Sequence, residues 1–323
     1  MMKKIAAFLA LILLAAVPYG CSAGLEVKIE NMNKVFSGQT YERCVYSAEI
    51  NNGKADAAKQ IYTDPALSEL VVEFEKTADG LAHITTELTV VYTSTPPYFN
   101  PELDCAGMTD RIRSEAIFNG YSDAFNPISV KKELDLDTSR AFDEKDKSFK
   151  AEFLYPDPVK KAKGEGKYSN LDGSDEKTFT AKVKSLKNAF DNEQLYYLIS
   201  ALMRGTVKDD ATALGYTKQY KFFNLFDRIN YGKGAQSYGF TVAAAKLNAY
   251  QNVTVTGNIA QVTVSFPKGQ PLIMYYSLGE DIKIGGAAIT ARPRLMLGYT
   301  QKTSNSTAVL SETQYVLKSY EKA

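Results

Sequence analysis

Hydrophobic and polar residues alternate along much of this chain, with the period of two that is typical of strands with one face in water. The clearest case is the pair of runs 69–76 and 81–92, which flank an Asp79–Gly80 turn. In the second run the alternation predicts this buried set: Ala82, Ile84, Thr86, Leu88, Val90 and Tyr92. The pattern therefore predicts an antiparallel hairpin with one wet face.

Strand signals of this kind recur to the end of the chain, and roughly 14 strands are expected from them. A second hairpin is predicted over 251–267, where Gly257 and Asn258 suit a tight turn. Parallel neighbours would need long crossover connections, usually helices, and the links here are mostly short. The pattern therefore favours an antiparallel meander. A proline-rich stretch at 95–105 is a candidate boundary between two β subdomains.

One segment, 189–205, has the pattern of a helix instead. Asp191 can cap the first amides, and Gln194 three residues later completes a capping box. Gly205 suits the left-handed position at which many helices end. The sequence therefore predicts an α-helix over Asn192 to Arg204.

The apolar residues of this predicted helix cover an arc of roughly 160°, wider than a helix on a flat surface needs. They are Leu195, Tyr196, Leu198, Ile199, Leu202 and Met203. Such a helix needs a concave partner, and a strongly twisted antiparallel sheet provides one. The predicted fold class is therefore mainly β, with a curved antiparallel sheet or half-barrel wrapped around one central helix.

A groove between this helix and the sheet is the candidate ligand site. Its predicted lining is Leu195, Tyr196, Ile199, Leu202 and Met203 from the helix, with Phe222, Phe223 and Tyr275 from the sheet. The alternative is that the same apolar side chains fill the core and leave no cavity.

Four stretches carry a resemblance to a known family. They are YSDAFNPISVKKELDLDTS, FDNEQLYYLISALMRG, VTVTGNIAQVTVSFPKGQPLIMYYSL and RPRLMLGYTQ. Over 121–301 the chain resembles bacterial envelope proteins of the DUF3108 type, which are uncharacterised and LolA-like. The resemblance implies an extracytoplasmic half-barrel, related in shape to carriers that hold acyl chains between a sheet and helices.

The first 23 residues have the layout of a bacterial secretory signal. Lys3 and Lys4 precede an apolar run from Ile5 to Val17, which is shorter than the roughly 20 residues of a membrane-spanning helix. Cys21 resembles the acylated cysteine of a lipoprotein, and ordinary cleavage after Ala23 is the alternative. Acyl chains on Cys21 would anchor the β-rich body, 24–323, to a membrane surface.

Charge and cysteine content narrow the expected partners. The chain has 38 basic and 37 acidic residues, and removal of the signal takes away two lysines. A nearly neutral body has no electrostatic reason to bind nucleic acid. Besides Cys21 the cysteines are Cys44 and Cys105, which form either a disulfide in an oxidising compartment or two buried free thiols.

The sequence offers little catalytic chemistry. His83 is the single histidine and falls on the polar face of its strand, so histidine triads and multi-histidine zinc sites are excluded. Asp172, Asp175 and Glu176 could hold calcium but fit plain turns better. Paired carboxylates for glycoside hydrolysis could come from Asp104, Asp110 and Glu115. No metal or cofactor is predicted.

These observations predict a non-enzymatic, exported envelope lipoprotein. It would bind a lipid or another apolar or amphipathic molecule in the groove between helix and sheet. The alternative is a structural or protein-interaction module with a filled core, and the remote alternative is a hydrolase that uses paired carboxylates. The expected location is the periplasm or the surface of an envelope membrane.

Overall fold

Strands dominate the computed structural model, which describes residues 39–54, 56–100, 102–119, 126–141, 148–156, 163–182, 189–197, 200, 216–223, 236–245, 247–266, 270–292, 294–304 and 309–323. Fifteen strands form one large sheet. In chain order they are β1 (Tyr41–Asn51), β2 (Glu69–Lys76), β3 (Leu81–Val91), β4 (Thr109–Asn119), β5 (Pro127–Leu136), β6 (Phe149–Leu154), β7 (Lys163–Ser169), β8 (Lys177–Lys182), β9 (Ala189–Asp191), β10 (Tyr216–Phe223), β11 (Gln236–Ala245), β14 (Ile259–Ser265), β15 (Leu272–Ser277), β18 (Met296–Ser304) and β19 (Val309–Lys322).

A second, small sheet has four strands. They are β12 (Ala249–Tyr250), β13 (Val253–Val255), β16 (Asp281–Ile284) and β17 (Ala287–Thr290). Three short 3-10 turns are described as well, at Asp56–Ala58 (η1), Asp137–Ala141 (η2) and Asn192–Gln194 (η5).

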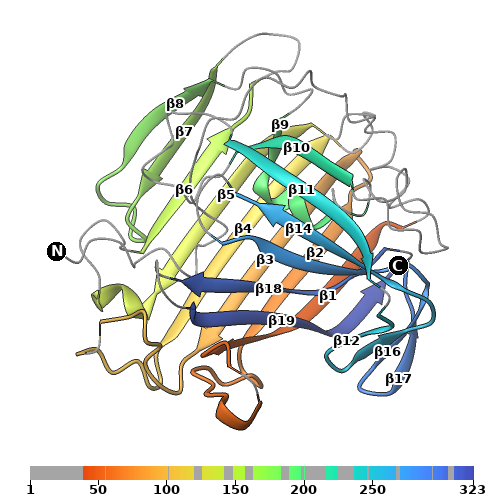
Figure 1. Cartoon of the computed structure of the whole chain (residues 1–323). Coiled ribbons are helices and arrows are strands. Elements are labelled where there is room, and N and C mark those ends of the chain that lie inside the picture. The colour runs from red at the N-terminus through yellow and green to blue at the C-terminus, as the bar shows by residue number, and fades with distance from the viewer. Residues whose placement is uncertain are drawn as a thin grey trace.

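The large sheet confirms the mainly antiparallel β prediction. Its strand order is β8-β7-β6-β5-β4-β3-β2-β1-β19-β18-β15-β14-β11-β10-β9, so β1 and β19 pair near its middle (Figure 1). Among the described strands, β9 and β10 form the one parallel pair. β8 and β9 end the sheet without pairing to each other, so the described sheet is curved but not closed.

Local patterns were predicted well where one face of a strand is buried. On β3 the inward side chains are at most 1% exposed at Ala82, Ile84 and Val90. His83 faces outward, and its Nδ1 lies 3.4 Å from Oε1 of Glu115. The β2–β3 hairpin forms around Gly80, whose φ of +85° suits a residue without a Cβ. β3 and β4 pair along eleven residues. The proline-rich stretch at 95–105 therefore connects neighbouring strands of one continuous sheet.

The predicted hairpin over 251–267 is wrong. β13 pairs with β12 and β16 in the small sheet, whereas β14 pairs with β11 and β15 in the large sheet. Gly257, at a φ of +104°, turns the chain from one sheet to the other. Both strands keep their alternation because each has its own buried face, and alternation alone does not identify the partner strand.

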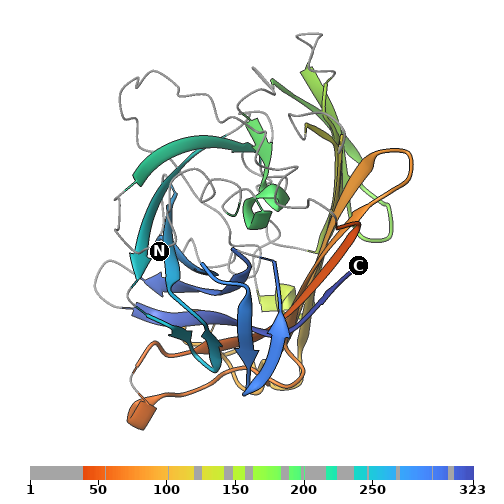
Figure 2. The same ribbon diagram turned by 90° about the vertical axis from the view of Figure 1, so that its right-hand side faces the viewer.

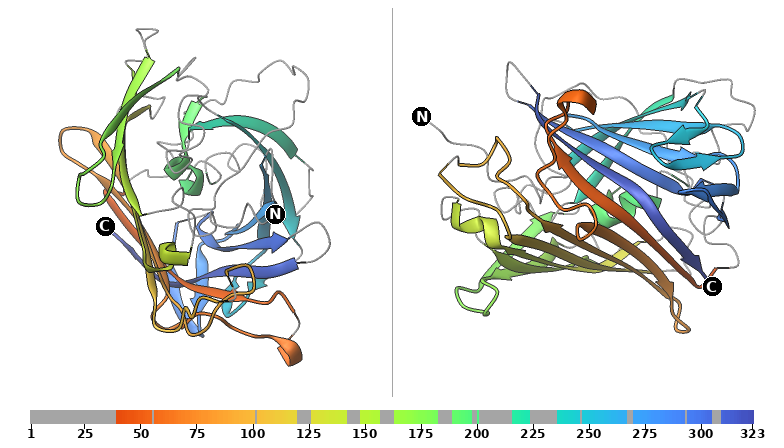
Figure 3. Two further views of the ribbon diagram at one scale, coloured as in Figure 1. Left: turned by 90° about the vertical axis from the view of Figure 1, so that its left-hand side faces the viewer. Right: turned by 90° about the horizontal axis from the view of Figure 1, so that it is seen from below.

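The large sheet curls around an interior that the chain itself enters. Figure 2 shows η5 inside the curve, between the β1–β6 wall and the β10–β15 wall. The left view of Figure 3 places it there as well. The predicted central helix, Asn192 to Arg204, is not supported as such. The described part is one 3-10 turn followed by helical residues Leu195–Tyr197 and Ser200, and the remainder lies outside the described residues.

Candidate functional site

One row of inward side chains faces the segment that enters the interior, residues 189–197 and 200, which is called the crossing segment below. The row runs across six neighbouring strands at one level of the sheet, from β1 to β6. Its members pair in register and are Cys44, Val72, Thr86, Ser114, Lys132 and Ala151. The adjacent row holds larger residues, Tyr46, Leu70, Leu88, Ile112, Leu134 and Phe149. Thr86 and Lys132 of the first row bind Glu193, so the crossing segment lies over that row.

The predicted capping box is present at the start of the crossing segment. The Glu193 amide donates to Oδ1 of Asp191 at 2.9 Å, and the Asp191 amide donates to Oε1 of Gln194 at 2.8 Å. These two bonds satisfy backbone donors that a helix start leaves unpaired inside the protein. The Asp-Asn-Glu-Gln sequence therefore fixes the local turn.

The first anchor of the crossing segment is a buried ion pair. Nζ of Lys132, fully buried on β5, lies 2.8 Å from Oε1 of Glu193 and 4.0 Å from Oδ1 of Asp191. Thr86 donates to the other Glu193 oxygen at 3.1 Å and shares a 2.6 Å hydrogen bond with Ser114. All of these groups are at least nine-tenths buried. The anchor therefore joins β3, β4 and β5 to the crossing segment.

One lysine faces two carboxylates in this anchor, and this imbalance of charge affects the pKa of Asp191. Burial raises the pKa of Asp191, the Lys132 ammonium opposes that rise, and the Glu193 carboxylate adds to it. Tyr155 donates to Oδ2 of Asp191 at 2.7 Å and favours the ionised form. The net result is a carboxyl that holds its proton to higher pH than an exposed aspartate.

The second anchor lies at the other described end of the crossing segment. Arg292 binds Glu42 on β1 with two hydrogen bonds, Nε to Oε2 at 2.6 Å and Nη2 to Oε1 at 3.1 Å. Its Nη1 donates to Ser200 Oγ at 3.3 Å, and Ser200 donates to the Arg294 carbonyl at 2.8 Å. The guanidinium also lies 5.6 Å from the Tyr197 ring centre. The crossing segment is therefore held at both described ends.

The residues predicted to line the ligand groove are only partly brought together. Leu195 and Tyr196 are buried in the interior, and the Tyr196 carbonyl accepts a 3.3 Å hydrogen bond from Tyr276. Tyr275 is next to Tyr276 on β15, points to the opposite face and stacks on Tyr250 of the small sheet at 4.2 Å. Ile199, Leu202 and Met203 lie outside the described residues, as do the side chains of Phe222 and Phe223.

The other candidate groups are dispersed. Cys44 and Cys105 are both buried free thiols, so the predicted alternative of a disulfide is not formed, and Cys21 lies outside the described residues. Asp172 accepts hydrogen bonds from the Ser174 amide and hydroxyl, as a turn residue does. Over the described residues, no group of three or more His, Cys, Asp or Glu is arranged to hold a metal ion.

The three carboxylates considered for glycoside hydrolysis do not converge. Asp110 points into the interior and Glu115, five residues later on β4, points outward, while Asp104 is exposed. Asp110 instead binds Tyr92 and Thr138, with Thr138 Oγ1 at 2.6 Å. Burial raises the pKa of Asp110 to about 6. This carboxylate fastens η2 to β4 and has no second acid opposite it among the three.

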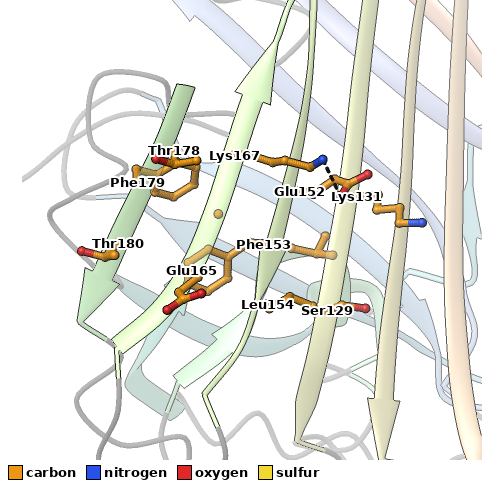
Figure 4. A pocket seen from close by; sticks show the side chains of 12 residues that line it. Ser129, Lys131, Glu152, Phe153, Leu154, Glu165, Lys167, Thr178, Phe179 and Thr180 are labelled. Atoms are coloured by element: carbon orange, nitrogen blue, oxygen red, sulfur yellow. Dashed lines mark ion pairs between the residues drawn. The ribbon is translucent and has the colours of Figure 1, made fainter. Parts of the chain in front are cut away.

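A hollow of about 720 Å³ lies on the outer face of β5–β8 and is called the outer hollow below. Its lining is Ser129, Val130, Lys131, Glu152, Phe153, Leu154, Glu165, Gly166, Lys167, Thr178, Phe179 and Thr180 (Figure 4). Each strand contributes two outward residues and the inward residue between them. Leu154 is 61% exposed there. The hollow is thus a feature of the sheet surface, remote from the predicted groove.

Sequence reasoning missed both anchors and the outer hollow. The sequence does indicate that Lys132 is buried, because it falls in phase with the inward residues Val130 and Leu134. A lysine at an inward position is rarely buried without a charged partner. Arg292 and Glu42 lie 250 positions apart, and neither has a local pattern that identifies the other. The outer hollow depends on the shape of the sheet, which alternation does not encode.

Fold and site together define a barrel-like β protein with an internal crossing segment. No family model matches the sequence, and no curated protein matches it. Among solved structures, the chain is similar to a beta-barrel-like protein of the domain of unknown function DUF1849 from Brucella abortus. The TM-score is 0.51 at 11% sequence identity, over 88% of this chain and 98% of that one. At this identity the likeness concerns the fold alone.

A search of the described residues for membrane-spanning helices found none of sufficient length and hydrophobicity.

Proposed function

We propose that this chain is an exported, lipid-anchored envelope protein that binds a partner protein at the outer hollow and catalyses no reaction. The observation that carries this proposal is the outer hollow, an open concave surface of about 720 Å³. The described interior is occupied by the crossing segment, whose Leu195, Tyr196 and Tyr197 are at most 6% exposed. Because these side chains occupy the part of the interior that the structure describes, we favour an interaction module over a carrier that holds its ligand there.

The same proposal includes two finer features. The crossing segment continues beyond Ser200 as the helix that its sequence pattern indicates, and the chain is a distant relative of the DUF3108-type envelope proteins. A lipid or another amphipathic molecule is the second candidate ligand, because Leu154 and Ile128 leave apolar surface exposed on the outer face of β5 and β6.

A photoreactive amino acid at position 154, introduced into the full-length protein in cells, tests the binding surface. Arg111 is the matched control, because it is exposed on the outer face of β4 and lies outside the hollow. A discrete cross-linked product is expected from position 154 and not from position 111. Equal products from both positions would contradict the proposed surface. Solvent extraction of the purified protein followed by mass spectrometry distinguishes the second candidate, because co-purified lipid would favour it.

The proposed lipid attachment at Cys21 has its own test. Radiolabelled palmitate is expected to label the wild-type protein in growing bacteria and not the Cys21→Ser variant. Labelling that survives this substitution, or that never occurs, would contradict acylation at Cys21 and leave the surface proposal untouched.

A further inference from the structure

The first anchor of the crossing segment holds the groups that an amide bond between two side chains requires. Lys132 supplies an amine, Asp191 a carboxyl group and Glu193 a second carboxylate, and all three residues are at most 3% exposed. Nζ of Lys132 lies 4.0 Å from Oδ1 of Asp191 and 2.8 Å from Oε1 of Glu193. A nucleophile, an electrophile and a base are therefore held together away from bulk water.

The backbone holds the amine and the carboxyl group of this anchor in place. Lys132 is paired in register with Ser114 of β4 and Ala151 of β6, and Asp191 ends β9, which pairs with β10. Groups fixed in this way react as if at very high concentration once the reacting atoms are about 3–3.5 Å apart. A movement of about 1 Å by the flexible end of Lys132 brings its nitrogen to that distance.

The surroundings of Asp191 favour attack on its carboxyl carbon. An ionised carboxylate is a poor electrophile, but burial raises the pKa of Asp191 and so increases the share of the protonated form. The Glu193 amide donates to Oδ1 at 2.9 Å, and the Tyr155 hydroxyl donates to Oδ2 at 2.7 Å. These two donors stabilise the negative charge that develops on a carboxyl oxygen when nitrogen adds.

Glu193 is placed to activate the lysine. Its Oε1 accepts one proton from the Lys132 ammonium, and the nitrogen lone pair then adds to the carboxyl carbon of protonated Asp191. A second nitrogen proton leaves with the Asp191 hydroxyl group as water, so one C–N bond forms and one C–O bond breaks. The products are an amide, one water and a neutral Glu193. The reaction therefore removes two buried charges, whose burial costs free energy.

We propose that Lys132 and Asp191 form an intramolecular isopeptide bond, with Glu193 as the base that activates the lysine. The bond joins β5 covalently to the start of the crossing segment. The ion pair between Lys132 and Glu193 is the state from which the bond forms, so the unreacted protein keeps every contact described above. The bond would form whether or not the outer hollow binds a partner and Cys21 is acylated.

Tryptic peptide mapping of the purified full-length protein tests for this bond. Trypsin does not cleave after an acylated lysine, so the bond should give one branched product that joins 132–140 to 188–204. Its mass should be lower than that of the two peptides together by one water, and fragmentation should locate the link at Lys132 and Asp191. Cleavage after Lys132 together with an unmodified 188–204 peptide would overturn the proposal.

Variants identify the role of each group, with the linked fraction followed at intervals after a pulse of labelled amino acids. Lys132→Arg keeps the positive charge and should give no branched product. Glu193→Gln should slow formation of the bond about a hundredfold or more, because a positioned base contributes at least that much. Glu133→Gln, an exposed neighbour on β5, is the matched control and should react at the wild-type rate. A wild-type rate in Glu193→Gln would overturn the role of Glu193 as the base.

Discussion

Lys132 and Glu193 are charged residues whose burial costs free energy. Removing a charged group from water costs several kcal/mol, and an ion pair recovers that cost only if its remaining hydrogen bonds are satisfied. Here Thr86 binds the second Glu193 oxygen at 3.1 Å, and Asp191 lies 4.0 Å from the Lys132 ammonium. The ion pair therefore does more to fix the position of the crossing segment than to stabilise the fold.

The Lys132→Met variant tests this interpretation. It should lose about 3–5 kcal/mol of unfolding free energy, because Glu193 is left as an uncompensated buried charge. The double variant Lys132→Met with Glu193→Gln should recover most of that loss. Urea denaturation of the wild type, Lys132→Met, Glu193→Gln and the double variant measures the coupling free energy between Lys132 and Glu193. Additive losses of unfolding free energy would show that the two groups act independently.

Asp110 should make stability depend on pH. Its pKa is raised to about 6 by burial, so the folded state binds a proton that the unfolded state releases near pH 4. A raised carboxyl pKa favours folding below that value, and its contribution of about 3 kcal/mol is lost as pH rises from about 4 to about 6.

Asp110→Asn should remove this pH dependence. Asparagine can still accept from the Thr138 amide, now 3.0 Å from Oδ1, and the hydroxyls of Thr138 and Tyr92 can turn to accept from its amide group. Between pH 4 and pH 7 the wild type should lose about 3 kcal/mol of unfolding free energy relative to the variant. Parallel stability curves over that range would contradict the assignment.

At the scale of elements, period-two alternation identified strands but not all of their partners. β2 and β3 pair as predicted because one short turn joins two strands with the same buried face. β13 and β14 have an equally clear pattern and lie in different sheets. The capping box at Asp191 was predictable because all of its atoms lie within four residues. The anchors were not, because their partners meet only after the sheet has curved.

Gly166 is an element-scale test of how β6, β7 and β8 pack. A Cβ there would lie 2.3 Å from the Phe179 ring and 2.8 Å from the Glu152 carbonyl oxygen. Gly166→Ala should therefore cost about 1–3 kcal/mol of unfolding free energy, as overpacking does. Gly239→Ala in β11 is the matched control, because its Cβ would meet nothing closer than 3.6 Å. Equal effects in thermal denaturation would contradict this account.

At the scale of the whole molecule, the strands nearest the two ends of the described chain join the two halves of the large sheet. β1 and β19 pair over ten residue pairs in the middle of the large sheet, and the Thr40 amide donates to the Ala323 carbonyl at 2.8 Å. The two walls around the crossing segment therefore meet at a seam between distant parts of the sequence. Contacts of such separation are slow to form, because closing so long a loop costs conformational entropy before the contacts stabilise it.

A circular permutant tests that seam. Joining residue 323 to residue 39 through a short glycine-serine linker, with new ends at the Gly285–Gly286 turn between β16 and β17, keeps β1 beside β19 and makes their contact local. The permutant should retain the thermal stability of the 39–323 body within a few degrees and refold faster. Deleting 305–323 is the control, since it removes β19 from between β1 and β18 and should abolish cooperative unfolding. A deletion that still unfolds cooperatively would show that the two walls are stable without the β1–β19 seam. A permutant that fails to fold would contradict the expectation that a local β1–β19 contact preserves the fold.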